Sequence, residues 1–331
     1  MKRLSTAFLI LLTVISFMPM ASREAHALSC TASISTPIDF GNVDLLSGGV
    51  VATTGQLDVI CSVGLLDLTS LLLGIAVCPG IGTGTGGADA SGRLLMRDGG
   101  TETLSYQIFA DANGQIPWGG FSGGLLLGDA PLFGIPATSI GTHSGSWPVY
   151  VVLAGGQSPI PTGTYRSTFS GSGATGTEIR YGSLGSALGC STLGALLQTS
   201  ANFTVQATVP KNCLVSTEDV NFGTHGLLNS AIPAEGAVNL TCTPGTEYSV
   251  ALETGGLPSG QRQMKKGSDS VTYALFQNAQ RTQLWGSAPG ETAAGMGTGS
   301  PNRFPVYGLV PPQTTPSAGV YKDTVIVTVT Y

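Results

Sequence analysis

The chain has 331 residues, enough for two domains, and only 10% of them are charged, against about 25% in an average soluble domain. Its net charge of −5 and its 14 basic residues include no basic cluster that would hold a nucleic-acid backbone, so nucleic acid is excluded as a partner. Six cysteines without a Cys-x-x-Cys pair favour disulfides formed in an oxidising compartment over metal or redox chemistry.

Residues 1–27 are typical of a signal peptide. Lys2 and Arg3 precede an apolar run that reaches Met20, and Ala25-His26-Ala27 supplies a cleavage pattern. The alternative is a membrane anchor, for which this run is short. We therefore expect export, with a mature chain that begins near Leu28.

An internal repeat organises the rest of the chain. Residues 104–112, followed by Trp118-Gly119, align without a gap on residues 271–279, followed by Trp285-Gly286. Three flanking matches accompany it: Phe40-Gly41 with Phe222-Gly223, Pro148-Val149-Tyr150 with Pro305-Val306-Tyr307, and Gly163-Thr164-Tyr165 with Gly319-Val320-Tyr321. Short β-branched runs between Gly, Pro, Ser and Asn predict an all-β fold of two immunoglobulin-like antiparallel β-sandwich domains.

The second copy shows its expected strands most clearly. They are residues 214–222, 236–243, 247–254, 271–277, 304–310 and 320–331. The Gly-x-Tyr that ends at Tyr321 resembles the tyrosine corner of immunoglobulin-like sandwiches. The alternative is a tyrosine that merely begins a strand.

The last predicted strand is followed by no seventh strand. It places Val325, Val327, Val329 and Tyr331 on the buried face. A sandwich without its final strand exposes an apolar cleft, which a strand donated by another protein fills by backbone pairing.

A strand of the same kind precedes Cys213. Phe203, Val205, Ala207 and Val209 alternate with polar residues, and we expect this internal donor strand to complete the first domain. The alternative is a linker strand that pairs with nothing in particular. The predicted domains are residues 28–209, including the closing strand 201–209, and residues 210–331.

Two Cys...Phe-Gly units, the Tyr-x-x-Phe segments and the ending of residues 319–331 resemble the spore coat protein U family. The two-unit layout is similar to that of tip adhesins of archaic (Csu-type) chaperone–usher pili. The resemblance implies pilin-type domains, a periplasmic chaperone, an outer-membrane usher, and a neighbouring pilin that donates a strand to the second domain. The first unit departs from the family pattern after Phe169, where a Gly-rich insertion replaces an uninterrupted final strand.

The position in a fibre is also predicted. Only Leu28 and Ser29 precede Cys30 in the expected mature chain, so no extension is left to donate onward. We expect the subunit to pass through the periplasm and to cap a pilus at the cell surface.

Three unusually apolar loops are expected at the far end of the first domain, where contiguous exposed apolar residues mark an interaction site. The predicted surface-adhesion residues are Leu65, Leu66, Leu125, Leu126, Leu127, Leu132, Phe133, Ile135, Leu184, Leu188, Leu193, Leu196 and Leu197. They would attach cells to abiotic or host surfaces and promote biofilm formation. The alternative is that these residues belong to core strands, and residues 71–73 are interpreted as strand C.

Other functions are set against this one. A lectin-like tip would recognise a host or matrix glycan with Trp118 and Trp147, and a third possibility is a structural coat or pilus subunit. Gly120-Phe121-Ser122-Gly123-Gly124 matches a nucleophile elbow without the strand-turn-helix context, and His143 and His225 are expected to be surface residues. We expect neither an enzyme nor a bound metal or cofactor.

The repeat predicts two disulfides, Cys30–Cys61 and Cys213–Cys242, each between the first two strands of a unit. Cys78–Cys190 follows by elimination. Strand order places these two cysteines toward opposite ends unless a loop doubles back.

Overall fold

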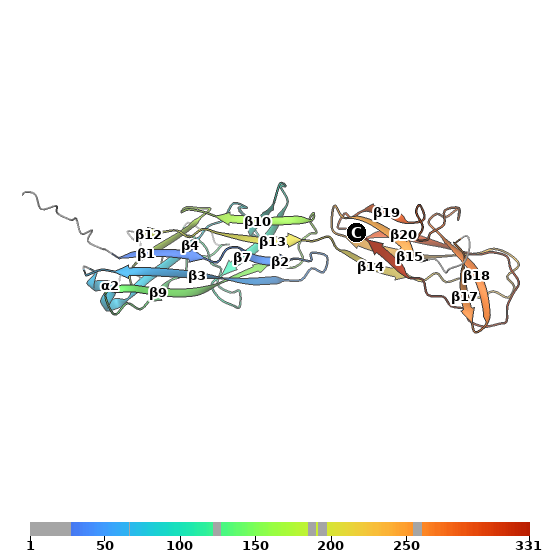
Figure 1. The fold of residues 1–331 in the computed structure, drawn as a ribbon, viewed down its shortest axis with the longest axis horizontal. Helices are drawn as coiled ribbons and strands as arrows, with labels where there is room; N and C mark the ends of the chain where they lie inside the picture. The colour runs from blue at the N-terminus through green and yellow to red at the C-terminus, as the bar shows by residue number, and fades with distance from the viewer. Residues whose placement is uncertain (1–27, 66, 122–126, 185–189, 191–196, 254–259) are drawn as a thin grey trace, which may run out of the picture.

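The computed structural model describes residues 28–331 apart from 66, 122–126, 185–189, 191–196 and 254–259. The predicted signal peptide lies outside these residues. The described chain forms two β-sandwich units that lie end to end, with strands β1 to β13 in the first and β14 to β21 in the second (Figure 1). Within these residues, no helix is long and apolar enough to cross a membrane.

The first unit contains one large and one small sheet. The large sheet has the order β1 (Ser29–Ile34), β3 (Val51–Val63), β9 (Gly141–Leu153), β7 (Thr103–Phe109), β6 (Gly92–Arg97), β10 (Gly163–Phe169), β13 (Phe203–Val209) and β2 (Ile38–Asn42), with β5 (Ala88–Asp89) on β6. The small sheet has the order β12 (Leu197–Thr199), β11 (Thr177–Ser183), β4 (Ile75–Ile81) and β8 (Phe133–Ile135).

The second unit repeats this plan with fewer strands. One sheet has the order β14 (Cys213–Glu218), β15 (Ile232–Cys242), β20 (Asn302–Val310), β18 (Asp269–Phe276) and β17 (Arg262–Lys266). The other has the order β19 (Ala293–Met296), β16 (Glu247–Leu252) and β21 (Val327–Thr330). The predicted fold class is therefore confirmed.

Each unit has its own apolar core. Strands with period-two sequences supply it: in β7, every second residue from Leu104 to Ile108 is buried, and β18 repeats this from Val271 to Leu275. The buried clusters of the two units share no residue. Two sandwiches, each with its own core, follow from the repeat in the sequence.

The three disulfides are the predicted pairs. Cys30 and Cys61 are directly opposite in the β1–β3 ladder, as Cys213 and Cys242 are in the β14–β15 ladder. Cys190 reaches Cys78 in the middle of β4, with a Cα–Cα distance of 5.6 Å. Cys190 therefore lies against the small sheet, at the same end as Cys78.

Some predicted elements differ from the observed ones. Residues 71–73 are not a strand but belong to the helix α2 (Leu68–Leu73), which is capped by Asp67 and followed by β4. In the second unit, β17 was not predicted because its sequence, Arg-Gln-Met-Lys-Lys, shows no apolar alternation. The predicted strand 320–331 is ladder-paired only in β21, with an isolated bridge at Lys322.

Candidate functional site

The seam between β10 and β2 of the first unit is closed by β13. This strand pairs antiparallel with β10 from Gly163↔Val209 to Phe169↔Phe203, and parallel with β2 at Val205↔Ile38. Its four predicted inward residues, Phe203, Val205, Ala207 and Val209, are all buried. The ring of Phe203 stacks on that of Phe169 with the centroids 4.3 Å apart. The segment that sequence analysis predicted to be a donor strand thus lies in the core of the first unit.

The last long strand of that unit is divided rather than replaced. Strand β10 ends at Phe169, and β11 resumes in the other sheet, paired with β4. Residues 170–176 make the crossing, with Gly171 at φ 65° and Gly173 at φ 110°, where glycine meets no steric penalty. The Gly-rich insertion is therefore a change of sheet.

A tyrosine corner places the corresponding strand in the second unit. The Tyr165 hydroxyl donates to the Pro161 carbonyl at 2.7 Å, and the Tyr321 hydroxyl donates to the Ser317 carbonyl at 2.6 Å. The predicted corner is confirmed and aligns the residues that follow, so that Ser167 corresponds to Asp323 and Phe169 to Val325. The pairing Lys265↔Lys322 likewise repeats Met96↔Arg166.

The same seam has unpaired edges in the second unit. Within the described residues, β21 pairs only with β16, and residues 219–226 form no ladder. We call the surface between them the open seam, and its apolar residues are half-buried against the core rather than buried: Val220, Phe222, Tyr321, Val325, Val327 and Val329. Tyr331, which was predicted on the buried face, is 50% exposed because it lies beyond the last β16–β21 pair, Ser249↔Thr330.

The residues that line the seam are buried in the first unit and only partly buried in the second. Ile38 and Phe40 of β2 are buried, whereas their counterparts Val220 and Phe222 are half-exposed. Both phenylalanines make the same edge-to-face contact with a core tyrosine, Phe40 with Tyr106 and Phe222 with Tyr273. The difference in burial therefore lies on the side of the ring where β13 packs in the first unit.

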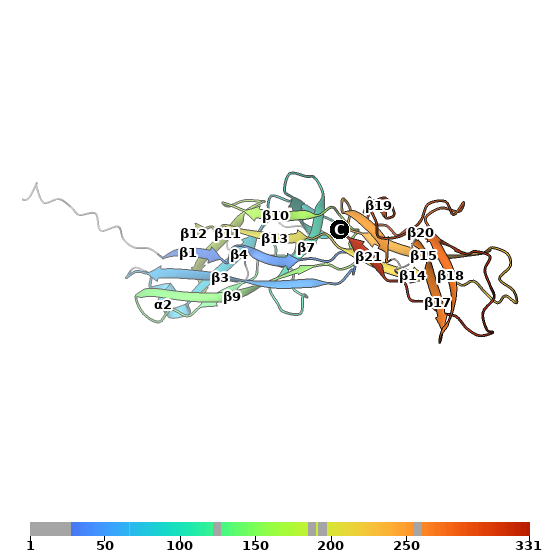
Figure 2. The same ribbon diagram turned by 45° about the vertical axis from the view of Figure 1, so that its right-hand side comes forward.

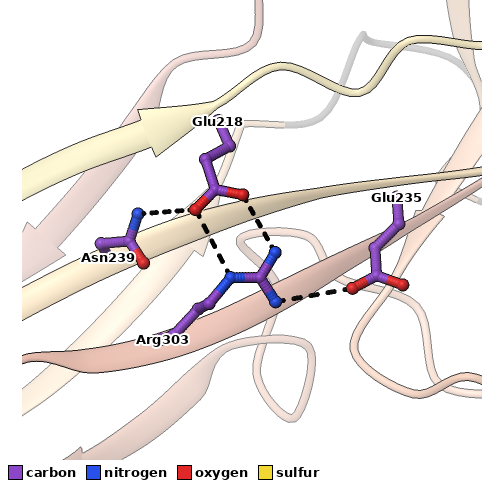
Figure 3. A network of polar contacts seen from close by, with 4 residues as sticks. All are labelled: Glu218, Glu235, Asn239 and Arg303. Carbon is purple, nitrogen blue, oxygen red and sulfur yellow. Dashed lines mark hydrogen bonds and ion pairs between the residues drawn. The ribbon is translucent and has the colours of Figure 1, made fainter.

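A polar network fixes the chain where β14 ends and the open seam begins. Figure 3 shows Arg303 between Glu218, the last residue of β14, and Glu235 of β15, at 2.9 and 3.5 Å. Asn239 donates to the same Glu218 carboxylate at 3.1 Å. The hydrogen bonds from Arg303 and Asn239 hold the pKa of Glu218 below its ordinary value of 4.5. Cross-strand contacts thus hold β14 in register up to the point at which ladder pairing stops.

Each unit also contains a buried arginine, which sequence analysis missed. Arg93 donates to the carbonyls of Ile81 and Trp118 through Nη2, at 2.7 and 2.8 Å, and burial lowers its pKa to about 10. Its counterpart Arg262 donates to the carbonyls of Leu252 and Glu253. The self-alignment carried a signal, because Arg-x-x-x-Arg at residue 93 matches Arg-x-x-x-Lys at residue 262.

The end of the first unit remote from the second carries an exposed apolar surface. Both views place α2 at that end (Figures 1 and 2). The pairing Val63↔Gly141 brings Ile140 beside the turn before α2. We call this surface the apolar pole and define it by Leu65, Leu68, Leu72, Leu73 and Ile140, all of them at least 52% exposed. Leu71 instead packs on the core.

The predicted adhesion leucines divide into three groups. Leu65, Leu132 and Leu197 are exposed. Leu127 and Leu184 are half-buried, and the Leu184 amide donates to the Gly74 carbonyl at the end of α2. The remaining leucines lie outside the described residues: Leu66, Leu125, Leu126, Leu188, Leu193 and Leu196.

One predicted loop residue, Ile135, is wrong as an exposed adhesion residue. Ile135 is 1% exposed because it pairs with Ile75 inside the small sheet. Phe133 is half-buried and stacks on Trp147, with the ring centroids 4.6 Å apart. A short apolar run can be either a loop or a buried strand, and here tertiary packing makes it β8.

One of the two tryptophans proposed for a glycan pocket is a core residue. Trp118 is fully buried and donates from Nε1 to the Pro79 carbonyl at 2.6 Å. Its counterpart Trp285 donates to the Val250 carbonyl at 3.0 Å. Trp147 is half-buried, with its ring against Phe133. Trp118 is therefore not available to contact a sugar, as the lectin interpretation requires.

The remaining chemistry of the described residues is simple. His143 is half-buried and His225 is exposed, and each contacts a nearby backbone carbonyl, of Ser139 and Phe222 respectively. Over the same residues, no group of three or more His, Cys, Asp or Glu side chains is arranged to hold a metal ion.

Comparisons with known proteins found several similar chains. Protein U of Myxococcus xanthus is 28% identical over 151 residues, which are 40% of this chain and 84% of that protein. A chain in the CsuC–CsuE chaperone–tip adhesion subunit pre-assembly complex, from archaic chaperone–usher Csu pili of Acinetobacter baumannii, has a TM-score of 0.53 and 17% identity. The match covers 92% of this chain and all of that one. The CupB6 tip adhesin of Pseudomonas aeruginosa has a TM-score of 0.39 and 14% identity over 92% of this chain and 94% of that one.

A family model, the Spore Coat Protein U domain, matches residues 17–171 and again residues 199–328. The second match begins ahead of β13. By sequence β13 therefore belongs with the second domain, although it packs in the first unit. With two matches that together span most of its length, the chain belongs to the Spore Coat Protein U domain family.

Proposed function

We propose that this chain is an exported adhesion subunit of a chaperone–usher pilus, and that it works by binding and not by catalysis. One observation carries the proposal: the seam that β13 closes in the first unit is bordered by unpaired edges and half-exposed apolar residues in the second. A repeated fold that is complete in one copy and open in the other is suited to accept a strand from another molecule.

The occupant of the open seam is a strand donated by a neighbouring pilin. The same kind of completion occurs within this chain, because β13 belongs to the second matched domain and completes the first unit. A donor with the same alternation would pair with residues 321–330 and cover Phe222 and Val325. Before assembly, a periplasmic chaperone would protect this seam, and an outer-membrane usher would exchange chaperone for pilin. The related complex of a chaperone with a tip adhesion subunit supports this order.

The adhesive surface is the apolar pole of the first unit, at the tip of the fibre. Leu28 is buried and β1 is paired with β3, so residues 28–34 are occupied by the first unit itself. The pole faces away from the second unit (Figure 1), and its helix α2 contains no charged residue. Apolar burial contributes about 25 cal/mol per Å² without chemical recognition of the target, so this surface would attach cells to plastics or host surfaces and promote biofilm formation.

The test replaces Leu65, Leu72 and Leu73 with Ser in the full chain and measures attachment of piliated cells to polystyrene. We expect at least a several-fold loss of attached cells with an unchanged number of fibres, counted by immunogold microscopy. Moderate salt should leave attachment of the parent intact, because the contact is not carried by charge.

A matched control changes exposed apolar residues away from the pole. Leu227 and Val320 of the second unit are 66% and 72% exposed, and Leu227→Ser with Val320→Ser should leave attachment unchanged. If pole variants that assemble normally attach as well as the parent does, the pole is not the adhesive site.

A further inference from the structure

The open seam of the second unit differs from the seam of the first by one charged residue. Asp323 occupies the position of Ser167, between Tyr321 and Val325 on the face that turns toward the core. Ser167 is fully buried, and its hydroxyl accepts a hydrogen bond from the Gly86 amide at 3.2 Å. Its own chain therefore satisfies the polar group, and β13 presents the aliphatic Val205 opposite it.

Unlike Ser167, Asp323 is exposed and its carboxylate is only partly satisfied by the chain. Its Oδ2 accepts from the buried Tyr273 hydroxyl at 2.7 Å and its Oδ1 accepts from the Thr324 amide at 2.8 Å, which leaves further acceptor capacity on both oxygens. The residue is exposed to water, which satisfies the rest. A strand that closes the seam as β13 does would remove this water.

Two buried polar side chains, Arg262 and Tyr273, interact with the carboxylate of Asp323. Arg262 is buried, its Nε has no hydrogen-bond partner among the residues that the structure describes, and its charge attracts Asp323. Burial and the hydrogen bond to Asp323 raise the pKa of Tyr273, so this phenol stays a donor. A carboxylate covered by an aliphatic side chain would lose its water without a replacement hydrogen-bond donor, at a high cost.

The register of the first unit identifies the donor residue that meets Asp323. Directly opposite residues in an antiparallel pair share a face, with Cβ atoms about 4.5–5.5 Å apart. By the correspondence with β10 and β13, the position that Val205 takes opposite Ser167 falls opposite Asp323, and that of Ala207 falls opposite Tyr321. We propose that the strand accepted by the second unit carries a hydrogen-bond donor such as Thr or Asn opposite Asp323. A small residue follows opposite Tyr321, and a large apolar residue precedes opposite Val325.

This inference rests on the proposed strand acceptance and names the chemistry of the partner. It also distinguishes the strand that closes the first seam from the strand that closes the second. The donor of the first seam is aliphatic at the central position, and the donor of the second is polar there. A strand such as β13 would then be a poor occupant of the second unit, which disfavours a second copy of the same chain as the donor.

The probes are two synthetic peptides with the sequence of residues 201–210, one unchanged and one with Val205→Thr. Their affinity for the full chain is measured by fluorescence anisotropy, for the parent and for Asp323→Ser, which restores the residue of the first unit. We expect the Thr peptide to bind the parent at least about tenfold more tightly than the Val peptide, the size expected for a hydrogen bond to a charged group. This preference should vanish or reverse in Asp323→Ser and persist in Lys322→Ser, which changes the exposed neighbour.

A second measurement avoids dependence on free peptide. Each sequence is fused after Tyr331 through a flexible linker, and hydrogen exchange of β16 and β18 reports closure of the seam. Equal affinity of the two peptides for the parent, or a preference that survives Asp323→Ser, overturns the inference while strand acceptance stands. If neither peptide binds and neither fusion protects the second unit, strand acceptance and the inference fail together.

Discussion

Phe40 and Phe222 provide an internal comparison that tests the open seam. They are counterparts in the repeat, and each meets a core tyrosine edge to face, with centroids 6.5 and 5.8 Å apart. Phe40 is 7% exposed, whereas Phe222 is half-exposed. Replacement by Ala removes the same atoms and the same aromatic contact from each unit. The difference between the two losses of unfolding free energy therefore measures how much less Phe222 is buried than Phe40.

The loss of unfolding free energy expected for each variant follows from how deeply its phenylalanine is buried. Phe→Ala at a buried site costs about 3–5 kcal/mol, so Phe40→Ala should destabilise the first unit by that amount. Phe222 is only partly buried, so less of the transfer contribution is available to lose, and Phe222→Ala should cost less than Phe40→Ala, by about 1 kcal/mol. When a strand fused after Tyr331 closes the seam, the cost of Phe222→Ala should rise toward that of Phe40→Ala.

The assay is native-state hydrogen exchange read by mass spectrometry, because peptides from β7 and β18 report the two units separately. The chain is measured with and without the fused strand. An equal cost for Phe40→Ala and Phe222→Ala in the chain without the strand would refute the reasoning. So would a cost at Phe222 that the strand does not change, since either result means that the open seam is already covered.

Two further predictions concern other contacts. Cys78–Cys190 closes a segment with a sequence separation of 112, so replacing both cysteines with Ala should lower the free energy of unfolding of the first unit by about 2–4 kcal/mol and leave the second unit unchanged in the same exchange experiment. For Glu218, a lowered pKa means stabilisation that is present above the ordinary value of 4.5 and lost as the pH falls through the pKa in the folded chain. The melting temperature of Glu218→Gln should therefore fall below that of the parent at pH 7 and converge with it at about pH 2, and an unchanged gap at the lower pH would contradict the assignment to this carboxylate.

Local patterns predicted much of the fold and of the open seam. The alternation in residues 203–209 marks a strand with one buried face wherever it pairs, because side chains of a strand point to opposite faces in turn. The repeat carried this reasoning from one unit to the other, and its aligned cysteines were enough to pair Cys30 with Cys61 and Cys213 with Cys242. The tyrosine corner was likewise visible in the Gly-x-Tyr pattern, because its hydrogen bond is local, to a carbonyl four residues upstream.

Other features depend on contacts that no local window contains. Residues 68–73 and 133–135 are equally apolar runs, yet the first forms an exposed helix and the second a core strand, because only the second finds a partner strand, β4, to pair with. Arg93 and Arg262 resemble surface charges in the sequence and are buried because carbonyls from distant segments converge on them. Local patterns thus specify two β-sandwiches and an alternating strand between them. Which apolar run becomes a helix or a core strand, and which arginine is buried, depends on tertiary contacts, since burial is set by which segments meet in space.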